Sequence, residues 1–70
     1  MDADKLVAMA NQIAAFFRVQ GGDAGAAVAK HIAENWDPRM RAAILAHLAQ
    51  GGEGLVAEAE AAVKRLSVRR

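Results

Sequence analysis

Glycine and proline interrupt this sequence at three places, and no other feature limits its fold as strongly. The interruptions are Gly21-Gly22-Asp23, Trp36-Asp37-Pro38 and Gly51-Gly52-Glu53-Gly54. Because these residue types end helices, each segment between them holds one short helix at most. Apolar residues inside the segments recur at helical spacing, and no segment shows the alternation of a half-buried strand. The sequence predicts an all-α fold: a small bundle of three to four short helices forming a single domain over residues 1–70. The expected helices span about residues 4–19, 23–35, 38–50 and 55–66.

Aspartate stands at the expected start of three of these helices. Asp2 or Asp4 is placed to cap the first helix, and Asp23 to cap the second. An aspartate at this position accepts a hydrogen bond from the N–H groups that a helix start leaves unpaired. The third start is the most distinct, because Asp37 precedes Pro38, whose backbone angle is already set for the first helical position.

The apolar residues are numerous but small. Of the 70 residues, 54% are hydrophobic, and 18 of them are alanine, which leaves 20 larger apolar side chains. A domain of this length buries only about 60% of the surface that its unfolded chain exposes. We therefore expect a thin core that gains from a permanent partner, and no room for a self-contained enzyme site.

Charge and apolar patterning indicate a soluble chain. Nine Lys and Arg residues against eight Asp and Glu give a formal charge of +1, which does not favour nucleic acid or an anionic membrane as partner. The N-terminus carries Asp2 and Asp4 where a secretory signal has basic residues. No uninterrupted apolar run exceeds five residues. We expect a cytoplasmic protein that binds neither nucleic acid nor membrane.

The residue types needed for catalysis or metal binding are sparse. There is no cysteine, threonine or tyrosine, and Ser67 is the only serine. His31 and His47 fall on different expected helices, and Glu34 one turn after His31 is a weak signal for a metal site. We expect no catalytic residue, no metal ligand and no cofactor-binding residue in this chain.

The segment from Trp36 to Arg41 concentrates the residues that most often anchor interfaces. It contains the only tryptophan, the only proline and two arginines. Two interpretations remain open: Asp37 and Trp36 hold the arginines locally, by ion pairing and by stacking of Arg41 on the ring, or the arginines and the ring bind a partner. Phe16 and Phe17 point about 100° apart on a helix, so one of them is a candidate for partner contact. The candidate interface residues are Trp36, Asp37, Pro38, Arg39, Met40, Arg41, Gln12 and Phe17.

Several strings, in this order and spacing, resemble one protein family over about residues 4–66. The strings are Leu6–Ile13 followed by Phe16-Phe17, then His31-Ile32, Trp36–Arg41 and Gly51–Leu55. The chain resembles the delta subunit of molybdenum-containing, NAD-dependent formate dehydrogenase. Of these strings, Met-Ala-Asn-Gln-Ile and Trp-Asp-Pro-Arg-Met-Arg are specific together.

This resemblance implies a non-catalytic accessory subunit of a soluble, cytoplasmic complex that oxidises formate and reduces NAD. The chain is then expected to dock on the catalytic (alpha) subunit, with beta and gamma subunits in the same complex, and to support its cofactor-loaded, active form. The implied cofactors are bis-molybdopterin guanine dinucleotide, iron–sulfur clusters and FMN, all held by other subunits. Asn11 and Gln12 lie in the first matching string. We expect Asn11 to bridge helices within the chain, and Gln12 is open between that role and an interface.

Two alternatives from other classes stand beside this interpretation. In a DNA-binding protein, residues 38–50 would form a recognition helix with Arg39 and Arg41 at its N-terminal end. A homo-oligomeric bundle would account for surplus apolar surface without any enzyme.

Overall fold

Four helices and no strand make up the part of the chain that the computed structural model describes, residues 2–68. The helices are α1 (Ala3–Gln20), α2 (Ala24–Asn35), α3 (Pro38–Ala49) and α4 (Ala57–Val68). The predicted all-α fold is confirmed. Residues 1, 69 and 70, which the predicted single domain also includes, lie outside the described residues.

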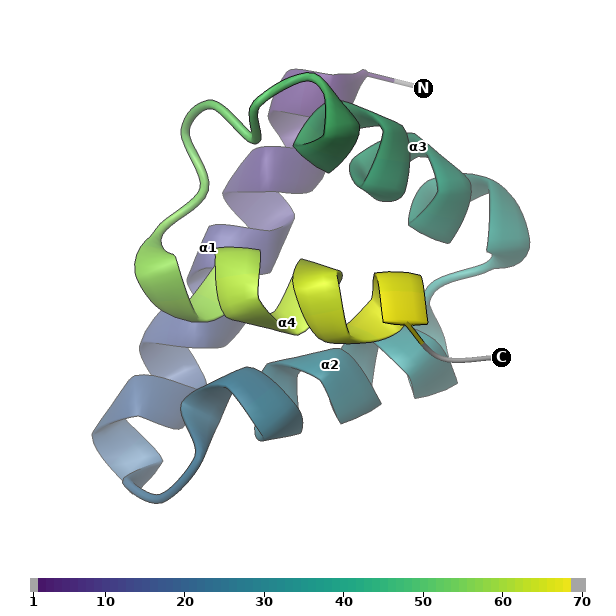
Figure 1. The fold of residues 1–70 in the computed structure, drawn as a ribbon. Helices are drawn as coiled ribbons and strands as arrows, with labels where there is room; N and C mark the ends of the chain where they lie inside the picture. Colours follow the sequence, from purple (N-terminus) through teal and green to yellow (C-terminus); the bar gives the residue numbers. More distant parts are fainter. Residues whose placement is uncertain (1, 69–70) are drawn as a thin grey trace.

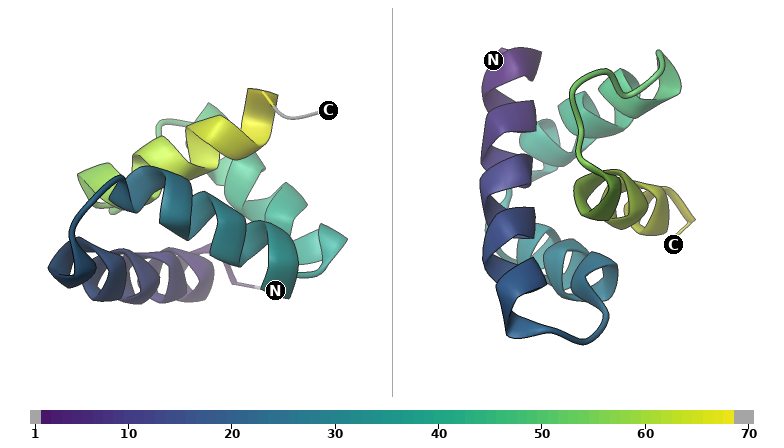
Figure 2. Two further views of the ribbon diagram at one scale, coloured as in Figure 1. Left: turned by 90° about the horizontal axis from the view of Figure 1, so that it is seen from below. Right: turned by 90° about the vertical axis from the view of Figure 1, so that its left-hand side faces the viewer.

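The helices pack around α4. Figure 1 shows α4 lying between α2 and α3, with α1 passing behind all three. Both α1 and α4 contact each of the other helices, and α2 packs most extensively against α4. In the right-hand view of Figure 2, α1 stands upright along one side of the other three helices. One face of α1 is therefore turned towards the other helices, and the opposite face is turned away from them.

Three helices begin at the predicted aspartates. The Oδ1 atoms of Asp2, Asp23 and Asp37 accept hydrogen bonds from the N–H groups of Asp4, Ala26 and Met40, at 3.0, 3.1 and 2.9 Å. Pro38 occupies the start of α3, as expected. For α1, the cap is Asp2, and Asp4 lies in the first turn. These local signals set the beginnings of α1, α2 and α3.

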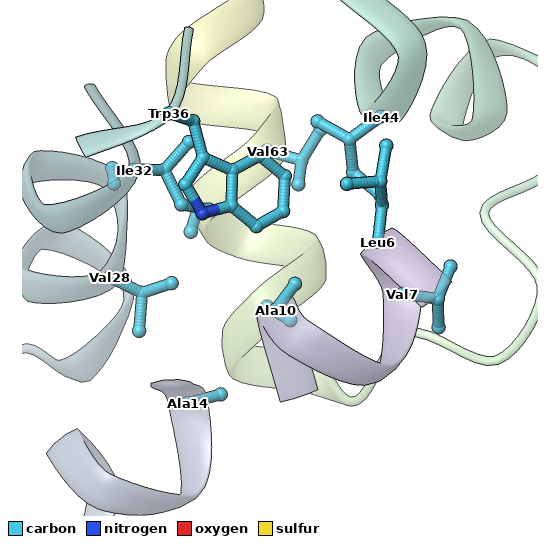
Figure 3. Close-up of a cluster of buried hydrophobic side chains, with 12 residues drawn as sticks. Leu6, Val7, Ala10, Ala14, Val28, Ile32, Trp36, Ile44 and Val63 are labelled. Carbon is cyan, nitrogen blue, oxygen red and sulfur yellow. The ribbon is translucent and has the colours of Figure 1, made fainter. Parts of the chain in front are cut away.

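The core is assembled from all four helices and from the α2–α3 connection. Its buried members are Leu6, Val7, Ala10, Ala14, Val28, Ala29, Ile32, Trp36, Ile44, Ala59, Ala62 and Val63. Figure 3 shows the Trp36 ring in the middle of this cluster, with Ile32 on one side and Leu6 and Ile44 on the other. Alanines at the helix contacts, such as Ala10 and Ala14, let the backbones approach closely.

The last helix differs most from the expected bounds. It begins at Ala57, two residues after the predicted start at residue 55, and it continues to Val68. The residues before it are in a loop in which Gly51, Gly52 and Gly54 have positive φ values, a conformation that glycine adopts without strain. The loop is held by side chains from α1 and α3, which the local sequence does not reveal.

That loop is clasped by two side chains. The amide of Asn11 on α1 donates a 2.8 Å hydrogen bond to the Gly54 carbonyl and accepts one of 2.9 Å from the Val56 N–H. Nε2 of His47 lies 2.8 Å from the Glu53 carbonyl oxygen. The expectation that Asn11 bridges helix contacts is confirmed.

Candidate partner-binding site

The segment from Trp36 to Arg41 forms the corner between α2 and α3. The Trp36 side chain is only 5% exposed and belongs to the core. Asp37 and Pro38 build the start of α3, and Met40 is half-buried against the core. Arg39 is exposed. Most of the corner thus has a structural role. Contact of this segment with a partner stays a prediction, and Arg39 is the residue of the corner that is best placed to make such a contact.

Arg41 is turned back onto the end of α2. Its Nη1 atom donates hydrogen bonds to the carbonyl oxygens of Trp36 at 2.6 Å and Ala33 at 3.3 Å. The last carbonyls of a helix have no partner within that helix, so the guanidinium satisfies groups that would otherwise need water. This is a local role, as one of the two sequence interpretations expected, but it uses backbone carbonyls. No ion pair joins Asp37 to an arginine among residues 2–68.

The other two predicted site residues, Gln12 and Phe17, meet in a groove between α1 and α2. We call this the phenylalanine groove, an open depression of about 270 Å³. Its lining residues are Gln12, Ile13, Phe16, Phe17 and His31. None of them is an acid, a lysine or an arginine, so the groove offers an apolar surface with two polar groups at its edge.

Aromatic rings shape the groove. The Phe16 and Phe17 rings meet edge to face, with centroids 5.2 Å apart and an interplanar angle of 82°. The Phe17 ring is also close to the His31 ring, at 6.1 Å and 62°. Phe17 is half-buried by these contacts, whereas Phe16 is 60% exposed. The sequence-based site included Phe17 and missed Phe16, although the angle between adjacent helical positions already indicated that one phenylalanine would face outwards.

A second depression, of about 350 Å³, adjoins the groove along α2. Phe17 and His31 line both of them, and Ala27, Lys30 and Glu34 complete the second. The charged residues Lys30 and Glu34 line this second depression and not the phenylalanine groove, whose other lining residues apart from His31 belong to α1.

Comparison with protein families supplies the identification. The family model of the NADH-dependent formate dehydrogenase delta subunit FdsD matches residues 5–63. The chain belongs to the FdsD family. The match runs from the first turn of α1 into α4 and includes the phenylalanine groove and the Trp36–Arg41 corner. No curated protein and no solved structure gives a significant match.

FdsD proteins are, by the name of the family, subunits of a formate dehydrogenase. Within the described part of this member, no three His, Asp or Glu side chains are grouped so that they could hold a metal ion. The two histidines are in different surroundings: His31 borders the groove and His47 contacts the α3–α4 loop. Among residues 2–68, no helix is both long enough and apolar enough to cross a membrane.

Proposed function

We propose that this FdsD-family chain is a non-catalytic accessory subunit that docks on the molybdenum-containing catalytic (alpha) subunit of a cytoplasmic NAD-dependent formate dehydrogenase. The beta and gamma subunits belong to the same complex. The observation that carries the proposal is the exposed phenylalanine groove. An aromatic ring that is 60% exposed beside an apolar groove is a feature of binding surfaces.

The residue inventory supports a non-catalytic role. The chain has no cysteine to bind an iron–sulfur cluster, and its single serine, Ser67, donates a 2.7 Å hydrogen bond to the Lys64 carbonyl. The proposal therefore assigns bis-molybdopterin guanine dinucleotide, the iron–sulfur clusters and FMN to other subunits. This chain contributes binding energy to the complex.

We further propose that docking favours the cofactor-loaded form of the catalytic subunit. A protein that binds one of two states more tightly shifts the equilibrium by the difference in affinity. A preference of about 3 kcal/mol changes the ratio of loaded to empty subunit by roughly a hundredfold. No catalytic group of this chain is needed for that effect.

The test is to purify the catalytic subunit from cells with and without this chain and to measure molybdenum content and formate oxidation per catalytic subunit. We expect both to fall together when the chain is omitted. Full molybdenum occupancy with lost turnover would contradict the loading role and would indicate a direct effect on the active enzyme. Unchanged molybdenum and unchanged turnover would contradict the accessory function itself.

The structure leaves only one of the two arginines that the DNA-binding alternative needs available for contact with DNA. Arg41 is bonded to the backbone of α2, so the start of α3 presents only Arg39 to a ligand. A recognition helix reads base edges with several side chains from its N-terminal part. No observation favours this alternative over the docking function.

A further inference from the structure

Between Lys5 and Arg18, which are both exposed, the face of α1 that is turned away from the bundle is uncharged. Its exposed side chains recur at spacings of four, three, one and three residues, which places them on one side of a helix. These residues, which we call the outward stripe, are Ala8, Gln12, Ala15, Phe16 and Val19. No Asp, Glu, Lys or Arg occurs from Leu6 to Phe17.

This pattern is unusual for a helix at a protein surface. The outer face of a surface helix normally carries charged residues, as α4 does with the Lys64–Glu60 ion pair at 3.5 Å. In contrast, the stretch of α1 from Leu6 to Phe17 is apolar on its inner face and nearly apolar on its outward stripe. Phe16 and Val19, exposed by 60% and 86%, are the large hydrophobic residues left most open to solvent in the described chain. A helix that is apolar on both sides is normally buried on both sides.

The outward stripe is continuous with the phenylalanine groove. Gln12 and Phe16 belong to both, so stripe and groove form one surface that extends from α1 towards α2. The depletion of charge and the presence of aromatic rings are the composition found at the centres of protein interfaces.

We propose that the outward stripe of α1 lies in a concave, uncharged apolar groove of the catalytic subunit, as a helix-in-groove contact. This inference rests on the proposed docking function and names the surface that performs it. Apolar residues at such spacings along one helix face are the pattern that grooves of this kind bind. Charge complementarity requires the opposing surface to be uncharged, because a charge placed against the stripe would lose its water without gaining a partner.

The size of the stripe favours a large partner over a second copy of the chain. A stable interface takes about 800 Å² from each partner, which is about a fifth of this chain's surface of 4470 Å². The stripe is about 17 Å long at the helical rise of 1.5 Å per residue. Two α1 helices crossing along that length meet over a narrow line and leave the phenylalanine groove open. A concave surface on a larger subunit covers stripe and groove together.

The experiment compares two charge insertions, Ala15→Glu on the stripe and Ala46→Glu on α3. Both alanines are exposed and lie at least three residues inside a helix end, and Ala46 is seven residues away from Arg39. Each affinity-tagged variant is co-expressed with the other formate dehydrogenase subunits. Recovery of the catalytic subunit is measured against salt concentration, and affinity is measured with the purified subunits. Circular dichroism checks that both variants keep native helicity and melting temperature.

We expect Ala15→Glu to weaken binding of the catalytic subunit by at least roughly tenfold and Ala46→Glu to leave it unchanged. Phe16→Ala, which removes an exposed ring without adding charge, should also weaken binding while native helicity is kept. Wild-type affinity of both folded stripe variants would overturn the proposal but leave the docking function intact. Equal weakening by Ala15→Glu and Ala46→Glu would overturn it too.

Size-exclusion chromatography with light scattering tests whether the stripe instead binds a second copy of this chain. Two results together would assign the stripe to a second copy and overturn the proposal. The wild-type chain would dimerise alone, and the Ala15→Glu variant would be monomeric and still bind the catalytic subunit normally. A wild-type chain that fails to bind the catalytic subunit would contradict both the stripe proposal and the docking function.

Discussion

Asn11 on α1 and Val56, the residue directly before α4, are 45 positions apart in the sequence, yet the Asn11 Oδ1 atom accepts a 2.9 Å hydrogen bond from the Val56 N–H. The Nδ2 atom of the same amide donates to the Gly54 carbonyl at 2.8 Å. One side chain of α1 thus binds the backbone on both sides of Leu55, directly before α4 begins at Ala57. This pair of bonds ties the α3–α4 loop to α1.

Asn11→Ala should lower the free energy of unfolding by about 2 kcal/mol, because two hydrogen bonds to backbone groups are lost and one of them is partly buried. Urea unfolding followed by circular dichroism measures this. The neighbouring Gln12→Ala is the control, because Gln12 is exposed and should change stability by less than about 0.5 kcal/mol. Equal stability of the two variants would contradict the structural role of Asn11.

Arg41 and Arg39 should differ in how much each contributes to the free energy of unfolding. Arg41→Ala is expected to cost about 2 kcal/mol, because the guanidinium bonds to the carbonyls of Ala33 and Trp36. Arg39→Ala removes an exposed side chain and should cost less than about 0.5 kcal/mol. A melting temperature lowered by several degrees in Arg41→Ala and unchanged in Arg39→Ala is the expected result. The reverse order would refute the assignment.

Arg39 also provides the test of the corner as an interface. Arg39→Glu should fold normally, since the side chain is exposed, and should reduce co-purification with the catalytic subunit if the corner touches that subunit. The measurement is the yield of catalytic subunit retained across a salt gradient. Retention at wild-type yield and salt resistance by a folded variant would remove Arg39 from the interface.

Trp36 and Phe16 should differ in how much they contribute to the stability of the fold. Trp36→Ala should destabilise the chain by about 3 to 5 kcal/mol, because the ring fills the centre of the core. Such a loss is comparable with the roughly 3 to 10 kcal/mol expected for the whole 70-residue chain, so this variant should be largely unfolded at 37 °C. Phe16→Ala should lose less than about 1 kcal/mol. Thermal unfolding of both variants under the same conditions measures this difference.

Metal removal should leave the isolated chain unchanged. His31 and His47 are on different helices, and the described residues contain no group of three metal-ligating side chains. Dialysis against a chelator should therefore preserve the helical circular dichroism signal and the melting temperature. A loss of helicity that zinc restores would show that the histidines bind a metal.

The parts of the fold that depend on neighbouring residues could be predicted from the sequence. Asp23 caps α2 and Asp37 caps α3, because capping needs only the right side chain next to the first turn. Proline at the start of α3 follows from the same local chemistry. These signals do not depend on how the helices are arranged.

The candidate site was harder to predict, because exposure is a property of the assembled fold. Trp36 was a candidate anchor for a partner, but the packed helices enclose its ring between Ile32 on one side and Leu6 and Ile44 on the other. Of the two adjacent phenylalanines, Phe17 was chosen as the candidate for partner contact, but α1 turns Phe16 towards solvent. The bonds of Arg41 to the end of α2 could not be predicted, because they depend on the angle between α2 and α3. None of these facts is encoded in the spacing of residues along one helix.

The clasp between Asn11 and the segment before α4 also has a consequence for biosynthesis. A nascent chain that has reached only the end of α3 lacks Val56 and the core residues of α4, so α1 has neither its polar partner nor the helix that the others pack around. The part of the core that α4 supplies stays open until this last helix is made. We therefore expect the domain to fold only once synthesis has passed α4.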